Sequence, residues 1–190
     1  MKQIGILGGT FNPIHIGHLA AAQAVRDALK LDEVLFVPSY YPPHKSKSAV
    51  IDAKHRMTMV SLAIRDNQKF SLCDLEIRRK GKSYSIDTLL ELKKIYPAKT
   101  RFYFIIGSDM LKGLSAWRRI DELAKLICFI AVDRKGYRKI NTPYRVKGVA
   151  MFDLGLSSSY LRQNLKQGKS VRYLLPEKVY RYIKKHRLYR

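Results

Sequence analysis

The sequence predicts an α/β fold in which helices cover both faces of a doubly wound parallel sheet. Short apolar runs rich in β-branched residues alternate with segments whose apolar residues recur at helical spacing. This alternation favours parallel strands joined by right-handed crossovers. Polar motifs follow several of the apolar runs, and such sheets bind ligands at the carboxyl ends of their strands. We therefore expect a ligand site at that edge of the sheet.

The individual elements follow from these patterns and from the residues that begin or end helices. Strands are expected at residues 4–7, 33–37, 70–75, 101–106, 126–132 and 149–154. Helices are expected at residues 17–31, 53–66, 85–95, 120–125, 157–168 and 177–186, with a short helical segment after residue 109. The candidate N-caps are Ser85 or Asp87, Ser108 or Asp109, and Ser157. Pro176 suits the first turn of the last helix.

The length of 190 residues suits one domain spanning residues 1–190, with a small helical C-terminal part from about 155 to 190. No internal repeat or linker divides it. No apolar run is long enough to span a bilayer, and the N-terminus enters a strand pattern at once. We therefore expect no membrane segment and no signal peptide. Cys73 and Cys128 make no disulfide framework, which favours a reducing, cytoplasmic location.

The formal net charge of +22 predicts attraction to polyanions. It does not distinguish nucleic acid, acidic lipid and phosphorylated small molecules. A generally basic proteome explains the charge equally well, because Lys and Arg are spread over the whole chain. The densest stretch, 178–190, keeps Val179, Tyr182 and Ile183 at helical spacing. The oligomeric state stays open, and the sequence is compatible with a homo-oligomer.

Residues 4–19, IGILGGTFNPIHIGHL, combine a strand, a glycine turn and the start of a helix. Gly8, Gly9 and Thr10 let the backbone turn with exposed N–H groups, and His15 and His18 flank the helix start. A helix N-terminus of this kind binds phosphate. Two imidazoles there can donate hydrogen bonds to oxygens whose charge grows in a transition state. The alternatives are a structural histidine, or a metal site that no neighbouring Cys, Asp or Glu completes.

The segment GGTFNPIHIGHL resembles the signature of the nucleotidyltransferase superfamily that carries an HxGH motif. Further motifs resemble the bacterial nicotinate-nucleotide adenylyltransferase family, in the family's order and over nearly the whole chain. They are PPHK (42–45), SYSIDTL (83–89), IIGSDM (105–110), Trp117, LSSSYLR (156–162) and YLLP (173–176). The resemblance implies a Rossmann-like fold. It also implies adenylyl transfer from ATP to nicotinate mononucleotide in NAD biosynthesis, giving nicotinate adenine dinucleotide (deamido-NAD) and pyrophosphate.

The resemblance also implies an ATP site built from both ends of the chain. In similar enzymes the glycine turn and the two histidines face the phosphates, with His18 closest to the α-phosphate. Asp109 accepts from the ribose, and Arg162 grips the β- and γ-phosphates with two serines of the same helix start. Without the resemblance, Asp109 and Ser157 would be helix caps and Arg162 a solvated residue. The implied ATP-binding residues are Gly8, Gly9, Thr10, His15, His18, Gly107, Asp109, Ser157, Ser158 and Arg162, with His15, His18 and Arg162 catalytic.

The implied site for nicotinate mononucleotide contains His44, Lys45, Tyr84, Thr88 and Trp117. Trp117 offers a flat face to a pyridinium ring. Backbone N–H groups around Tyr84 and Thr88, at a helix start, are placed to take a carboxylate, which favours nicotinate over nicotinamide. The alternatives are a core role for Trp117 and solvated loop positions for His44 and Lys45.

The implied reaction needs no covalent intermediate. The phosphate of the mononucleotide, whose second pKa is near ~6, attacks the α-phosphorus of ATP in line. Mg²⁺ is expected, held mainly by the ATP phosphates and water. The enzymatic alternative is pantetheine-phosphate adenylyltransferase or another HxGH nucleotidyltransferase, in which PPHK, SYSIDTL and Trp117 are not expected together. A remote alternative is a basic nucleic-acid-binding protein.

Overall fold

The computed structural model describes residues 1–41, 50–133, 142–152 and 154–190. Its six strands form one sheet in the order β3-β2-β1-β4-β5-β6, and each neighbouring pair is parallel. The prediction of a parallel, doubly wound sheet is thereby confirmed. The strands are β1 (Gln3–Gly9), β2 (Glu33–Pro38), β3 (Phe70–Leu72), β4 (Arg101–Gly107), β5 (Cys128–Asp133) and β6 (Val146–Ala150).

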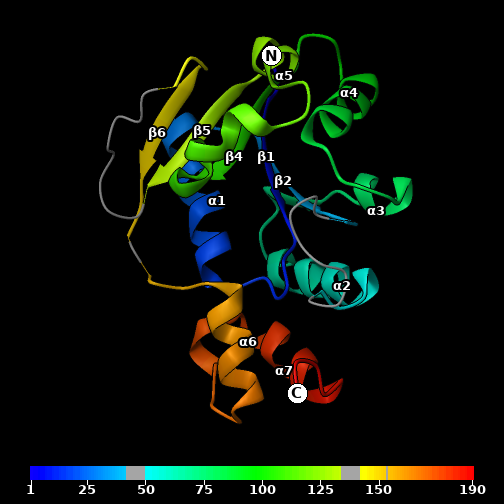
Figure 1. The fold of residues 1–190 in the computed structure, drawn as a ribbon, viewed down its shortest axis with the longest axis vertical. Helices are drawn as coiled ribbons and strands as arrows, with labels where there is room; N and C mark the ends of the chain where they lie inside the picture. Colours follow the sequence, from blue (N-terminus) through cyan, green and yellow to red (C-terminus); the bar gives the residue numbers. More distant parts are fainter. Residues whose placement is uncertain (42–49, 134–141, 153) are drawn as a thin grey trace.

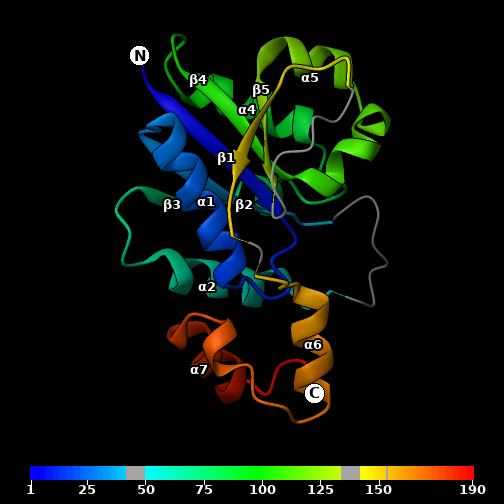
Figure 2. The same ribbon diagram turned by 90° about the vertical axis from the view of Figure 1, so that its left-hand side faces the viewer.

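Helices cover both faces of the sheet (Figures 1 and 2). The α-helices are α1 (Ile16–Leu29), α2 (Ala53–Ile64), α3 (Leu75–Arg79), α4 (Ser85–Ile95), α5 (Ile120–Leu126), α6 (Ser158–Lys166) and α7 (Glu177–Lys185). Two 3₁₀ segments, η2 (Ser108–Ala116) and η3 (Arg172–Leu174), complete the described elements. None of the helices in the described ranges is long and apolar enough to cross a membrane.

Two apolar clusters hold these layers together, because successive strand residues point to opposite faces. In β1, Leu7 joins a cluster with α1, α2, α6 and α7, whereas Ile4 and Ile6 join a second cluster with α3, α4, α5 and η2. Strands buried on both faces read as continuous apolar runs, which is how the central strands appear in the sequence.

The C-terminal helices form a separate group at one end of the molecule, coloured orange to red in Figure 1. Helix α7 packs against α2 through Val179 and Ile183, which are buried in the same cluster as Met59 and Val60. Lys178 Nζ forms an ion pair with Asp66 at 2.7 Å, and Tyr182 Oη lies 2.9 Å from His55 Nδ1. The start of α6 lies close to the segment after β1, because Ser158 Oγ donates to the Pro13 carbonyl at 2.8 Å.

Several expectations about local structure were wrong. The last strand spans Val146–Ala150 and not 149–154, and the strand expected at 70–75 ends at Leu72, before the unexpected helix α3. The expected side-chain caps at 85 or 87 and at 108 or 109 are also absent. The N-cap residues there are Tyr84 and Gly107, and neither start has a side-chain cap hydrogen bond. Only Ser157 caps as expected, because its Oγ accepts from the Tyr160 N–H.

Candidate active site

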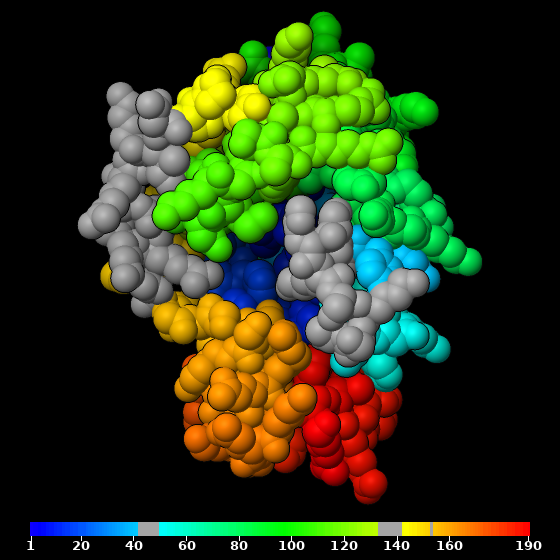
Figure 3. Space-filling view, viewed as in Figure 1, coloured from blue at the N-terminus to red at the C-terminus, as the bar shows by residue number. Residues whose placement is uncertain are grey.

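A cavity of about 670 Å³ opens at the carboxyl ends of β1 and β4. In Figure 3 the N-terminal segment, in blue, forms the floor of a hollow between η2 (green) and α6 (orange). The cavity brings together most of the described residues that the sequence predicts for a site. These are Gly8, Gly9, Thr10, His15, His18, Tyr84, Gly107, Asp109 and Trp117.

Residues 8–10, which we call the glycine turn, bring main chain to the cavity. Contrary to expectation, Gly8 and Gly9 are the last residues of β1 and pair with β2, and the chain turns at Asn12 and Pro13. Gly8 is exposed, and a Cβ on Gly9 would lie 3.2 Å from the Phe11 ring. The carbonyl of Gly9 accepts from the Ser39 N–H at 2.9 Å, so the turn is joined to the segment after β2. The turn is therefore a fixed backbone surface, suited to close approach by a phosphate.

The two histidines form a stacked pair at the start of α1. His15 is the N-cap residue, and its ring lies 3.8 Å from that of His18, centroid to centroid, at an interplanar angle of 34°. A Cβ on Gly17 would lie 3.1 Å from the His15 ring, so the glycine between the histidines makes room for the stack. Phe11 packs edge-on against His18 at 5.1 Å. The glycine of the HxGH motif is therefore needed because a side chain there would crowd the stacked rings.

The hydrogen bond to His18 defines how that ring can act. Its Nδ1 accepts from the His15 backbone N–H at 3.2 Å, as the third residue of a capping box does. A neutral imidazole that accepts at Nδ1 carries its proton at Nε2. His18 lines the cavity, so Nε2–H is the group that can donate to a bound oxygen.

Helix α6 brings residues from the far end of the chain to the turn after β1. Ser158 Oγ donates to the Pro13 carbonyl at 2.8 Å, and Arg162 Nη1 donates to the Asn12 carbonyl at 2.8 Å. Arg162 Nη2 also donates to Ser159 Oγ at 3.1 Å. Ser157, Ser158 and Arg162 do not line the cavity themselves, although Leu156 immediately before them does. The structure thus places this helix start at the margin of the cavity.

Gly107 and Asp109 meet at the end of β4. A Cβ on Gly107 would collide with Asp109 Oδ1, so the carboxylate lies directly against the glycine. Asp109 is exposed at the cavity, and no side-chain cap hydrogen bond is present at the start of η2. The alternative of a helix cap is therefore excluded for Asp109.

Trp117 combines packing with exposure to the cavity. Its ring stands edge-on to Phe104 at 5.9 Å and to Phe129 at 6.1 Å, and the residue is half-buried. Tyr84 lies on the same side of the cavity and carries the Arg118 guanidinium 4.6 Å from its ring centroid. Trp117 thus packs against the core and also lines the cavity, and its contact with the acceptor stays a prediction.

Thr88 does not reach the cavity, contrary to expectation. Its side chain is fully buried, its hydroxyl donates to Glu76 Oε1 at 2.6 Å, and its N–H donates to the Tyr84 carbonyl within α4. A donor already used by the helix cannot take a ligand carboxylate. The first turn of α4, Ser85–Asp87, is the better candidate, because the first N–H groups of a helix have no partner within it.

Glu76 is a cavity residue that the sequence did not suggest. It is 6% exposed, lines the cavity beside Ser83, and belongs to α3, which the strand pattern concealed. Burial raises the pKa of its carboxyl, although hydrogen bonds from Thr88 and Ser83 oppose the shift. The predicted residues His44 and Lys45 lie outside the described residues.

Comparison with known proteins places this geometry among nucleotidyltransferases. Residues 6–164 match a family model described as cytidylyltransferase-like. The chain is 49% identical over 189 residues to a probable nicotinate-nucleotide adenylyltransferase of Oceanobacillus iheyensis, covering 100% of this chain and 97% of that protein. It is 47% identical over 189 residues to the corresponding protein of Bacillus cytotoxicus, covering 100% and 99%.

Solved structures agree on the fold. Plasmodium falciparum nicotinic acid mononucleotide adenylyltransferase, complexed with NaAD, superposes with a TM-score of 0.83 at 24% identity, covering 100% of this chain and 98% of that chain. A putative nicotinate-nucleotide adenylyltransferase from Vibrio parahaemolyticus gives 0.73 at 21% identity, with 100% and 96% covered.

Proposed function

Because the chain belongs to the family of bacterial nicotinate-nucleotide adenylyltransferases, we propose that it transfers the adenylyl group of ATP to nicotinate mononucleotide. The products are nicotinate adenine dinucleotide and pyrophosphate. One observation carries the proposal beyond family membership. A single cavity is lined by the glycine turn and both histidines on one side and by Trp117 and the start of α4 on the other. That arrangement suits two nucleotides whose phosphates meet.

The reaction is an in-line displacement at the α-phosphorus of ATP. The mononucleotide phosphate is largely dianionic at neutral pH, since its second pKa is about 6, and one of its oxygens attacks directly. The α-phosphorus forms a bond to that oxygen as its bond to the bridging oxygen breaks, and that electron pair leaves with pyrophosphate. No protein nucleophile is required, so catalysis consists of positioning and charge stabilisation.

The histidine pair and α6 supply the charge stabilisation in this proposal. His18 donates from Nε2 to an α-phosphate oxygen, and His15 stacks behind it and contributes the cap of α1. The positive end of α1 adds to this field. Arg162, with Ser157 and Ser158, binds the β- and γ-phosphates, whose departure leaves charge on pyrophosphate. The bonds from Ser158 and Arg162 to the turn after β1 support their place beside the same phosphates.

The adenosine and the acceptor occupy opposite parts of the cavity. Asp109 accepts from the ribose hydroxyls, and Gly107 lets the nucleoside lie against the end of β4. Trp117 stacks on the pyridinium ring of the acceptor. The first turn of α4, next to Tyr84, binds the acceptor carboxylate. His44 and Lys45 remain candidates for its phosphate on the strength of the family resemblance.

Mg²⁺ accompanies ATP in this proposal and neutralises phosphate charge. Within the described ranges, no group of three or more His, Cys, Asp or Glu residues could hold a metal ion. An ion held by phosphate oxygens and water, which is how Mg²⁺ is commonly bound, needs no such group of protein ligands. The side chains named above act on the phosphates themselves.

The experiment that tests the proposal is an assay of pyrophosphate release with ATP and one acceptor at a time. Nicotinate mononucleotide is expected to be used best, nicotinamide mononucleotide poorly, and 4′-phosphopantetheine not at all. Rapid turnover with 4′-phosphopantetheine instead would favour the alternative function, that of a pantetheine-phosphate adenylyltransferase. Salt-sensitive RNA binding without turnover of any acceptor would select the nucleic-acid-binding alternative.

A further inference from the structure

Arg56 is a buried cation whose described partners are all main-chain oxygens. It lies on α2 and is 1% exposed. Its Nη1 donates to the carbonyls of Thr10 at 2.8 Å and Ser39 at 2.7 Å. Its Nη2 donates to the Tyr40 carbonyl at 3.3 Å, and its Nε to the Ile51 carbonyl at 3.1 Å. Burial lowers the pKa of this guanidinium.

Three of these carbonyls, those of Thr10, Ser39 and Tyr40, belong to the two segments that leave the sheet at the cavity. The parallel pairing of β1 and β2 ends at Gly9 and Pro38, and the last bond between the two segments runs from the Ser39 N–H to the Gly9 carbonyl. Beyond that point the sheet no longer holds the chains together. Arg56 bridges Thr10 and Ser39, the next residues on each side, with one nitrogen. It therefore continues the connection between β1 and β2 past the end of the ladder.

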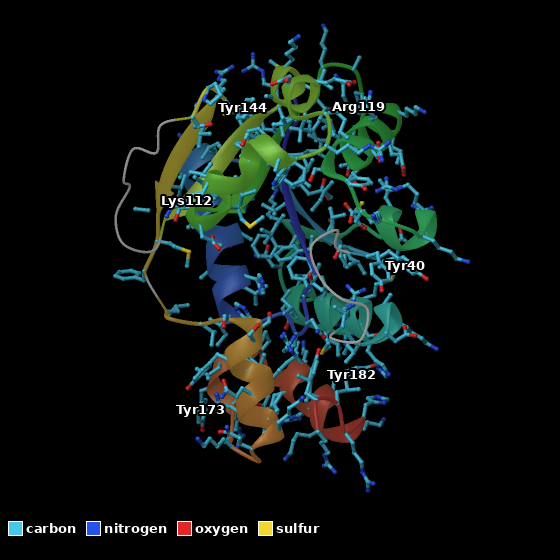
Figure 4. The ribbon with its side chains drawn as sticks, in the orientation of Figure 1. Tyr40, Lys112, Arg119, Tyr144, Tyr173 and Tyr182 are labelled. Atoms are coloured by element: carbon cyan, nitrogen blue, oxygen red, sulfur yellow. The ribbon has the colours of Figure 1, made fainter. Side chains whose placement is uncertain are left out.

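The peptide between Ser39 and Tyr40 is held from both sides. Its carbonyl accepts from Arg56, and its N–H donates to Ser83 Oγ at 3.0 Å. Ser83 and Glu76 both line the cavity near the start of α4. Tyr40, labelled in Figure 4, lies just after the end of β2. A chain of bonds thus runs from the Thr10 carbonyl through Arg56 and the peptide between Ser39 and Tyr40 to Ser83.

A guanidinium suits this role better than other side chains. It presents several N–H donors in a rigid plane, so it can hold carbonyls from three segments at fixed mutual positions. A lysine keeps the charge but offers a single compact head on a flexible stem. Replacing Arg56 by lysine therefore changes the geometry of the contact while keeping its charge.

We propose that Arg56 is a positioning residue for adenylyl transfer, which holds the glycine turn and the segment after β2 in the register that aligns ATP with the acceptor. The inference rests on the proposed function. In-line attack needs reacting atoms about 3–3.5 Å apart, and a misplacement of about 1 Å costs on the order of 10²-fold in rate. Arg56 touches neither substrate in this account and acts through the main chain that it holds.

The test compares Arg56→Lys with the matched variant Arg65→Lys, which changes an exposed arginine at the end of the same helix. We expect Arg56→Lys to lower kcat by about 10²-fold per folded active site, with smaller changes in both KM values. Arg65→Lys should keep the wild-type values. Active sites are counted by titrating the product dinucleotide against Trp117 fluorescence, so a loss of folded protein does not mimic a loss of rate.

A second variant covers the case in which Arg56→Lys does not fold. Ser83→Ala removes the acceptor of the Tyr40 N–H at the other side of the same peptide, and we expect about 10-fold lower kcat from a folded protein. Wild-type kcat in folded Arg56→Lys overturns the proposal, as does wild-type kcat in Ser83→Ala when Arg56→Lys is unfolded. If the wild-type protein itself fails to use nicotinate mononucleotide, the proposed function fails instead, and the two failures are distinct.

Discussion

Two walls of the cavity differ in how the chain builds them. The glycine–histidine wall, Gly8, Gly9, Thr10, His15 and His18, comes from one short segment. The Trp117 wall, Glu76, Tyr84, Ser85 and Trp117, comes from α3, the start of α4 and the end of η2. The first wall is local and carries the phosphate chemistry in our proposal. The second is assembled by tertiary packing and selects the acceptor.

The difference suggests that chemistry and selectivity are separable in this molecule. A change in the glycine–histidine wall should lower turnover with every acceptor. A change in the Trp117 wall should alter the KM for the acceptor, or the choice between acceptors, while leaving ATP binding in place. Substitutions in the two walls and in α6 test that separation.

The largest effect is expected from His18→Ala. Removing a preorganised donor to a transition-state oxygen costs about 10²–10³-fold in kcat. Steady-state pyrophosphate release measures the loss, and circular dichroism reports whether the variant is folded. His186→Ala, which changes an exposed histidine on the outer surface beyond α7, is the matched control and should keep wild-type turnover. A near-normal kcat in folded His18→Ala would contradict the proposal that the glycine–histidine wall carries the phosphate chemistry.

A somewhat smaller loss is expected from Arg162→Ala, on the order of 10²-fold in kcat/KM for ATP, because a bidentate phosphate contact disappears. Arg162→Lys should recover part of the loss, since it keeps the charge without the planar fork. Arg181→Ala, an exposed arginine paired with Glu177 on α7, serves as control. An unchanged kcat and an unchanged KM for ATP in Arg162→Ala would contradict the proposal that α6 contributes to the phosphate site.

Trp117→Ala should raise the KM for nicotinate mononucleotide by about 5- to 30-fold, since a desolvated cation–π contact contributes about 1–2 kcal/mol. The KM for ATP should change little. Trp117→Phe keeps an aromatic face, so its KM for nicotinate mononucleotide should lie between those of wild type and Trp117→Ala. Because Trp117 also packs on Phe104 and Phe129, both variants need a thermal unfolding control. A rise in the KM for ATP as large as that for the acceptor would contradict the separation of the walls.

The smallest effect is expected on stability, through Glu76. Burial raises the pKa of this carboxyl above its ordinary value near 4.5. Above pH 4.5 the folded state therefore holds more protons than the unfolded state, and the stability contributed by the neutral carboxyl is lost as pH rises through the folded pKa. Glu76→Gln cannot titrate, so its stability relative to wild type should improve from pH 4 to pH 8. Urea unfolding at several pH values measures this, and parallel curves for the two proteins would contradict it.

The sequence predicted the glycine–histidine wall because its information is local. A strand, a glycine pair and a helix start occur in order within residues 4–19, and the structure confirms the strand and the helix start. The turn expected at the glycines was wrong, because Gly8 and Gly9 pair with β2 as the end of β1. The role of Gly17 was not visible, since its need arises only from the stacking of His15 on His18. Arg162 reaches the N-terminal segment through a contact with Asn12 that spans most of the chain, and only the family resemblance suggested that these two segments meet.

The Trp117 wall was predicted less well for physical reasons. A buried polar residue such as Glu76 can be predicted only when its hydrogen-bond partners are known, and its partner Thr88 lies in another element. Arg56 reads in sequence as one more basic residue on a helix, because its carbonyl partners carry no side-chain signature. Thr88 was misplaced because its hydroxyl and N–H are already used inside α3 and α4. The strand expected at 149–154 was wrong because β6 ends at Ala150, and the apolar residues Phe152 and Leu154 beyond it are exposed and do not form part of a buried strand.

The central claim, that the start of α4 selects the acceptor by its carboxylate, is tested most directly by Ser85→Pro. Ser85 is the first residue of α4, where helices tolerate proline, and Tyr84 before it has the extended backbone that a following proline requires (φ −106°, ψ 132°). The change removes one N–H donor while keeping the helix. The measurement is the ratio of kcat/KM for nicotinate mononucleotide to that for nicotinamide mononucleotide. We predict a ratio at least ~10-fold below wild type, in line with the loss of a charge-assisted hydrogen bond. An unchanged ratio in a folded, active variant would contradict the claim.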